Sequence, residues 1–104
     1  MWAHRRYSDV KIRNATSEQA NEILRGFATI PKNATNVNVE YTPFASATIE
    51  CELSENLTRQ WCKKNDWQIT NDEPKSGYFE FSAQVPTGFR GGRWKNGRVL
   101  FIVH

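Results

Sequence analysis

The sequence is poor in the residues that catalysis most often needs. Its only two histidines, His4 and His104, lie at the ends of a 104-residue chain, where a side chain is rarely held firmly enough to act as a general base. There is no Gly-x-Ser-x-Gly nucleophile motif, no phosphate-binding loop, no dinucleotide-binding glycine motif and no His-Glu-x-x-His. We therefore expect a protein that is not an enzyme and that holds no cofactor and no metal.

Long apolar runs are also missing. No stretch approaches the roughly 20 residues needed to span a bilayer. The basic residues near the N-terminus are not followed by an apolar segment, so we expect no signal peptide in this chain. The sequence predicts a small soluble protein, which is either cytoplasmic, or secreted or periplasmic with a leader outside this sequence.

Cysteine is scarce, and Cys51 and Cys62 alone make neither a disulfide framework nor a metal site. In a reducing compartment both would be ordinary thiols, whereas in an oxidising one the ten residues between them would allow a short disulfide loop. Cys51 falls on the apolar side of a predicted strand, where a thiol is inert. Cys62, predicted at the boundary of a helical apolar stripe, is better exposed and has Lys63 beside it, so it is the candidate of the two for a reactive thiol, although a weak one.

Leucine is limited to four residues, whereas Phe, Trp and Tyr together contribute 13. Aromatic and β-branched side chains favour strands, so the composition predicts a core built largely on a sheet. A chain of this length forms one domain, which we place over residues 1–104.

Hydrophobic periodicity predicts the elements of that domain. Apolar residues at a spacing of two predict strands, and a spacing of three and four predicts helices. The predicted strands span 8–13, 37–41, 45–53, 66–70, 78–85, 93–95 and 98–103, and the predicted helices span 17–27 and 55–65. Asn96-Gly97 predicts a tight hairpin turn, and 86–92 is predicted to be an irregular loop.

This order of elements predicts an α+β fold. We expect two amphipathic helices on one face of a mainly antiparallel sheet, in a ferredoxin-like, split β-α-β arrangement with an extra C-terminal hairpin. The last strand is continuously apolar from Val99 to Val103, which is typical of a strand in the middle of a sheet. If it were instead an edge strand, it would allow self-association by strand addition.

The surplus positive charge lies in the arm from residue 88 to residue 98. Residues 86–104 contain four basic residues and no acidic one, while residues 1–52 are balanced at six of each. The candidate anion-binding residues of this arm are Arg90, Arg93, Trp94, Lys95 and Arg98. Basic residues between aromatic ones are typical of single-stranded nucleic-acid binding.

Two hypotheses about function follow. The first is a non-catalytic protein-interaction or assembly module with an unidentified protein partner. The second is anion or single-stranded nucleic-acid binding through the basic arm, with Trp94 stacking on a base. Against the second, Glu50, Glu52 and Glu80 are predicted to face outward on the sheet, where they would repel phosphate.

Overall fold

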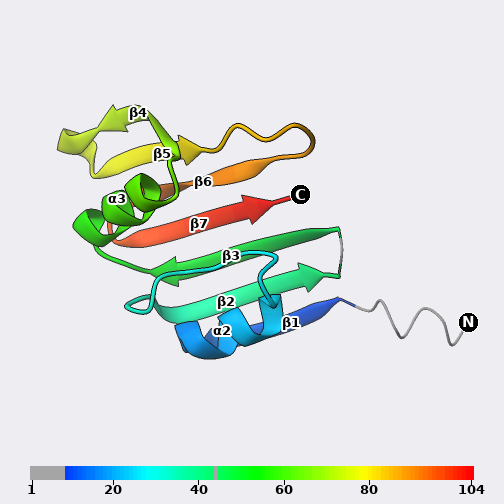
Figure 1. The fold of residues 1–104 in the computed structure, drawn as a ribbon. Helices are drawn as coiled ribbons and strands as arrows, with labels where there is room; N and C mark the ends of the chain where they lie inside the picture. Colours follow the sequence, from blue (N-terminus) through cyan, green and yellow to red (C-terminus); the bar gives the residue numbers. More distant parts are fainter. Residues whose placement is uncertain (1–8, 44) are drawn as a thin grey trace, which may run out of the picture.

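The computed structural model describes residues 9–43 and 45–104. His4 lies outside the described residues, and so does Ser8, where the first strand was predicted to start. The described residues contain seven strands, two α-helices and one short 3-10 helix (Figure 1). In chain order these are β1 (Val10–Ala15), α2 (Ser17–Leu24), β2 (Thr35–Thr42), β3 (Ser46–Glu52), α3 (Glu55–Lys64), β4 (Gln68–Glu73), η1 (Pro74–Ser76), β5 (Tyr78–Ser82), β6 (Arg90–Lys95) and β7 (Arg98–Val103).

The described strands form a single sheet in the order β1-β2-β3-β7-β6-β5-β4. Every neighbouring pair is antiparallel, which confirms the α+β class with an antiparallel sheet. Figure 1 shows β3 and β7 in the middle of the sheet and β1 and β4 at its two edges. The C-terminal strand is therefore central.

The strand order differs from the ferredoxin-like arrangement. A split β-α-β unit has parallel strands on either side of its helix, with another strand between them, whereas β1 and β2 are adjacent and antiparallel. The reason is that α2 has only eight residues. Together with the segment 25–34 it brings the chain back to the end of the sheet where β1 stopped, so β2 runs in the opposite direction.

The two faces of the sheet differ in what covers them. The face we call inner carries Val39, Ile49, Phe81 and Phe101, which share one hydrophobic core with the buried residues of both helices. From α2 these are Ala20 and Leu24, and from α3 they are Trp61 and Cys62. We call the opposite face of the sheet the outer face.

Capping side chains set where the helices begin. The Thr16 hydroxyl accepts a hydrogen bond from the Gln19 amide, and the Gln19 side chain accepts one from the Thr16 amide, forming a capping box. Ser54 caps α3 through the Leu57 amide, as its sequence position predicts. Helix α2 is shorter than the predicted 17–27, because Arg25 (φ 49°) and Gly26 (φ 83°) turn the backbone into the left-handed region.

Aromatic contacts join α3 to the second half of the sheet. The Trp61 ring lies 5.1 Å from that of Phe101 and 5.8 Å from that of Phe81. Trp67 stacks on Phe81 at 5.6 Å and an interplanar angle of 8°. Offset and edge-on pairs of this kind add stability beyond the area they bury.

Strand β6 begins earlier than the sequence predicts. The predicted loop 86–92 is wrong at its end, because Arg90, Gly91 and Gly92 pair with both β5 and β7. Neighbouring strands impose the extended conformation here on residues with low strand propensity. The predicted turn is confirmed, since Asn96 (φ 48°) and Gly97 (φ 90°) both take positive φ.

No helix within the described ranges is long and apolar enough to cross a membrane.

Candidate functional site

The strand β6 divides the basic arm between the two faces of the sheet. Side chains alternate along a strand, and the register pairs Trp94 with Val99 and Phe79, both of which are inner-face residues. Arg90 and Trp94 therefore belong to the inner face, whereas Arg93 and Lys95 belong to the outer face. The five candidate residues are not brought together into one site.

Trp94 is part of the core. Its side chain is 7% exposed, its ring stacks on Phe79 at 5.6 Å, and its indole Nε1 donates a hydrogen bond of 2.9 Å to the Leu53 carbonyl. A ring covered on this scale has no free face for a nucleic-acid base. Trp94 consequently contributes to stability, and it carries no part of the binding proposal below.

Arg90 also has a structural partner. Its guanidinium donates a hydrogen bond of 3.0 Å to the Phe27 carbonyl, which holds the loop after α2 against β6. The following glycines, Gly91 and Gly92, lie inside a strand that is paired on both sides. Their amides are thus in the sheet rather than in a concave turn that could cradle an anion.

Three of the predicted residues do meet on the outer face. Arg93 and Lys95 of β6 and Arg98 of β7, which we call the cationic cluster, line a shallow hollow of about 170 Å³ together with Glu50, Val99 and Leu100. Lys95 lies directly opposite Arg98 in the β6–β7 register. Like charges in such positions repel each other unless an anion lies near them.

Glu50, Glu52 and Glu80 lie on neighbouring strands beside the cationic cluster, and one of them forms an ion pair with it. The Arg98 guanidinium lies 4.0 Å from a Glu50 carboxylate oxygen. Within the described residues, Arg93 and Lys95 make no ion pair at 4.0 Å or less. Two of the three cations are therefore free to contact an external anion.

Glu80 is opposite Arg93 in the register, but other groups occupy its carboxylate. It accepts hydrogen bonds from the Tyr78 hydroxyl and, at 2.6 Å, from the Asn71 amide. These bonds lower the pKa of Glu80, the Tyr78 bond most, and the same bond raises the pKa of Tyr78. Glu80 is thus an ionised acceptor, and the charge of Arg93 also lowers its pKa.

An apolar stripe runs beside the cationic cluster. Leu100 and Ile102 of β7 face outward and are half-buried, and Phe89, which precedes β6, is 40% exposed. A Cβ added at Gly91 would lie 3.0 Å from the Phe89 ring, so this ring covers the glycine opposite Ile102. We call Phe89, Leu100 and Ile102 the outer apolar stripe.

The sequence analysis missed the outer apolar stripe, although a signal for it exists. In the continuous run from Val99 to Val103, alternation sends every second residue to the face opposite the core. Leu100 and Ile102 must therefore face outward once Val99, Phe101 and Val103 face inward.

Charges over the outer face as a whole are balanced when the cationic cluster is included. Strand alternation and cross-strand register place five acidic and five basic side chains there, namely Glu40, Glu50, Glu52, Glu73, Glu80, Lys11, Arg13, Arg93, Lys95 and Arg98. Lys11 pairs with Glu40 at 3.8 Å, and Glu52 accepts a hydrogen bond from the Asn36 amide. The cationic cluster is therefore a local feature and not part of a long basic stripe.

Both cysteine thiols are free and buried. The sequence placed Cys62 at the boundary of the apolar stripe of α3, and this is wrong, because its side chain is fully buried. Burial raises the pKa of Cys51 to about 12 and that of Cys62 to about 11. Protonated, covered thiols of this kind are poor nucleophiles.

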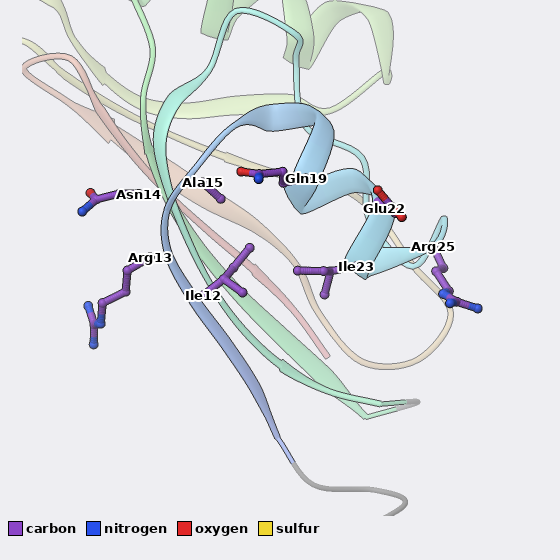
Figure 2. A pocket seen from close by; sticks show the side chains of 8 residues that line it. All are labelled: Ile12, Arg13, Asn14, Ala15, Gln19, Glu22, Ile23 and Arg25. Carbon is purple, nitrogen blue, oxygen red and sulfur yellow. The ribbon is translucent and has the colours of Figure 1, made fainter.

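A second hollow, of about 580 Å³, lies between β1 and α2 (Figure 2). Figure 2 shows Ile12 and Ile23 pointing toward each other inside it, while Arg13 points away on the far side of β1 and Arg25 points outward from the end of the helix. Its charged groups diverge, so they do not converge on a ligand as a binding site requires.

Within the described residues, no group of three or more His, Cys, Asp or Glu side chains could hold a metal ion. Comparison of the chain with protein-family models, with curated proteins and with solved structures gives no match.

Proposed function

We propose that this protein is a non-catalytic interaction module that binds an acidic, partly apolar segment of a protein partner on the outer face of β6 and β7. The observation that carries the proposal is the position of the cationic cluster directly beside the outer apolar stripe. The proposal takes both helices to pack on the inner face of the sheet. The outer face is then open to a partner.

The composition of this surface supports protein binding. Protein interfaces combine an apolar centre with a polar rim, and they are enriched in aromatic residues and arginine. The outer face has this arrangement, with Phe89 and Leu100 in the centre and Arg93 and Arg98 beside them. Exposed cations at the rim would steer an acidic segment onto the surface.

A nucleic-acid partner fits this surface less well. Base stacking needs exposed rings, and because Trp94 is buried, Phe89 is left as the exposed ring of the basic arm. Phosphates and an acidic segment would both meet Glu50 near the cationic cluster. The apolar side chains of a partly apolar segment can cover Leu100 and Ile102, which phosphates cannot do.

Strand addition at the C-terminal strand is not the route proposed. β7 is paired with β3 on one side and β6 on the other, so it has no free edge. The two free edges in the described residues belong to β1 and β4, and both have an irregular register, at Asn14 (φ 53°) and Asn71 (φ 47°). Irregular edges hinder the pairing of an added strand.

Defined probes can test the proposal. We would titrate the protein with a short peptide that alternates Glu and Leu, with its Lys and Leu analogue, and with a short oligothymidylate, and map the contacts by NMR. The acidic peptide should shift the backbone resonances of β6 and β7. Replacing Arg93 and Arg98 by Ala should weaken its binding by about fivefold to tenfold and reduce its dependence on salt.

Arg13→Ala is the matched control. Arg13 is an exposed arginine on β1, four strands and roughly 19 Å from β6, so its loss should leave binding unchanged. Tighter binding of the oligothymidylate than of the acidic peptide would favour the nucleic-acid hypothesis instead. Equal binding of the acidic and basic peptides would overturn the role of the cationic cluster.

A further inference from the structure

A groove of about 640 Å³ separates α3 from the segment 29–33. One helix face forms its first wall, because Leu57, Gln60, Trp61, Lys64 and Asn65 are spaced by three and four residues. The second wall is the segment from Thr29 to Asn33, which ends in a turn at Lys32 and Asn33, and Asn21 of α2 closes the groove.

The second wall is held in place by side chains of α2. Asn21 brackets Ile30, since its amide group donates to the Ile30 carbonyl at 3.1 Å and accepts from the Ile30 amide at 2.9 Å. The Ser17 hydroxyl donates to the Lys32 carbonyl at 2.8 Å. These bonds fix the position of the wall, so binding in the groove costs little ordering of the chain.

The floor and the rim of the groove have different chemistry. Ile30 and Trp61, which are 2% and 7% exposed, form an apolar floor together with half-buried Leu57. At the rim, Lys32 on one wall and Lys64 on the other are both exposed. No Asp or Glu lines the groove, so its lining carries two positive charges and no negative one.

The end of α3 lies at this groove, and several of its last backbone carbonyls accept hydrogen bonds. The Asn65 amide and side chain both donate to the Trp61 carbonyl, at 3.2 Å and 2.8 Å, and the Trp67 amide donates to the Cys62 carbonyl at 2.9 Å. Capped carbonyls oppose a nearby anion less than free ones would.

We propose that this groove binds a small amphipathic carboxylate. The apolar body of the ligand lies against Trp61 and Ile30, and its carboxylate pairs with Lys32 or Lys64. The volume falls within the range of about 300–1,000 Å³ that is usual for small-molecule sites, which are mostly apolar with a few polar groups that orient the ligand. The site lies on the inner side of the molecule and does not depend on the outer-face proposal.

Two carboxylates with different apolar parts, an alkyl chain and an aromatic ring system, show which kind of apolar body the groove prefers. We would titrate the protein with decanoate and with 2-naphthoate, and use decanol and decyltrimethylammonium as probes that keep the alkyl tail but lack the negative charge. NMR should show shifts at the Trp61 indole and along 29–33 with at least one carboxylate. Decanol and decyltrimethylammonium should bind more weakly than decanoate.

Neighbouring lysines provide a matched control. Lys64→Gln and Lys32→Gln should each weaken carboxylate binding by about twofold to fivefold, the effect of one exposed ion pair. Lys63→Gln should not, because Lys63 is exposed on the same helix but does not line the groove. Gln60→Trp should fill the groove and prevent binding, with an unchanged circular dichroism spectrum showing that the fold is retained.

The outcomes separate the alternatives. Decanol binding as tightly as decanoate would show an apolar pocket without charge selection and would overturn the proposal. So would an equal effect of Lys63→Gln and Lys64→Gln, or the absence of any shift with both carboxylates.

Discussion

At the residue scale, burial determines the chemistry of the two cysteines. The usual pKa of the thiol is 9.0, and burial raises it to about 12 for Cys51 and about 11 for Cys62. Above pH 9 the unfolded chain therefore loses thiol protons that the folded protein retains. Because the folded state then binds more protons, its stability must fall as the pH rises from the usual thiol pKa toward the raised one. The loss is up to about 1.4 kcal/mol per pH unit for each thiol.

A pair of proteins tests this prediction. Urea unfolding of the wild type and of the Cys51→Ala/Cys62→Ala variant would be compared at about pH 8 and about pH 10. Over that interval the free energy of unfolding of the wild type should fall by about 1 kcal/mol per thiol more than that of the variant. All other ionisable groups are the same in the two proteins, so their contributions cancel. Equal losses in the two proteins would contradict the role of the thiols.

Single residues of the basic arm show what the sequence could predict. Alternation alone puts Trp94 on the opposite face from Arg93 and Lys95, so the sequence contained the evidence against one shared site. The burial of Trp94 was harder to predict, since it depends on Phe79 and on the Leu53 carbonyl, which come from distant parts of the chain. The groove beside Trp61 depends in the same way on a loop that has no periodic pattern.

At the element scale, one arginine joins α3 to the sheet. The Arg59 guanidinium donates two hydrogen bonds to Asp72, at 2.8 Å and 2.9 Å, and one to Glu55 at 2.9 Å, and it lies 4.3 Å from the centre of the Phe79 ring. The planar fork of arginine allows all these contacts at once, and lysine cannot reproduce them. The Arg59 hydrogen bonds also hold the pKa of Asp72 below its usual value.

We therefore expect Arg59→Lys to destabilise the protein by about 1 kcal/mol near neutral pH, measured by urea unfolding. A carboxyl with a lowered pKa stabilises the fold above its usual pKa and stops doing so as the pH falls through the lowered value. The difference in the free energy of unfolding between variant and wild type should hence become smaller in acid, below the usual pKa of 3.8 for Asp72. Arg25→Lys, at an exposed arginine without an ion pair in the described residues, should change neither stability nor its pH dependence.

The extents of the elements followed local rules with four exceptions. Strand β4 extends past its predicted end into the expected loop, β5 stops short of its predicted end, and α2 and β6 also differ from their predicted bounds. Alternation predicted β3 and β7 nearly to the residue, and the caps at Thr16 and Ser54 lie where the helices were expected to start. Helix α2 ended early because the left-handed turn at Arg25 outweighs the helical spacing of Phe27. The start of β6 was missed because strand pairing, and not the propensity of glycine, determines it.

At the scale of the whole molecule, the strand order was beyond the reach of local patterns. The sequence shows that β7 is buried enough to be central, but not which strands flank it. Its pairing with β3 joins the first half of the sheet, β1 to β3, to the second half, β4 to β7, across about 50 residues of sequence. Such pairings are decided by the packing of a complete core, to which both halves contribute.

The shared core predicts that the two halves unfold together. Trp61, Trp67 and Trp94 all belong to the second half of the fold, so in a Trp2→Phe variant the indole fluorescence reports on that half alone. Far-ultraviolet circular dichroism reports on all strands. The urea midpoints from the two methods should coincide, as for a single cooperative domain.

Ile49→Ala in β3 removes a fully buried side chain from the first half. It should lower the free energy of unfolding by about 2–5 kcal/mol and shift both midpoints to lower urea together. A fluorescence midpoint that stays in place while the circular dichroism midpoint falls would show that the halves fold as separate units.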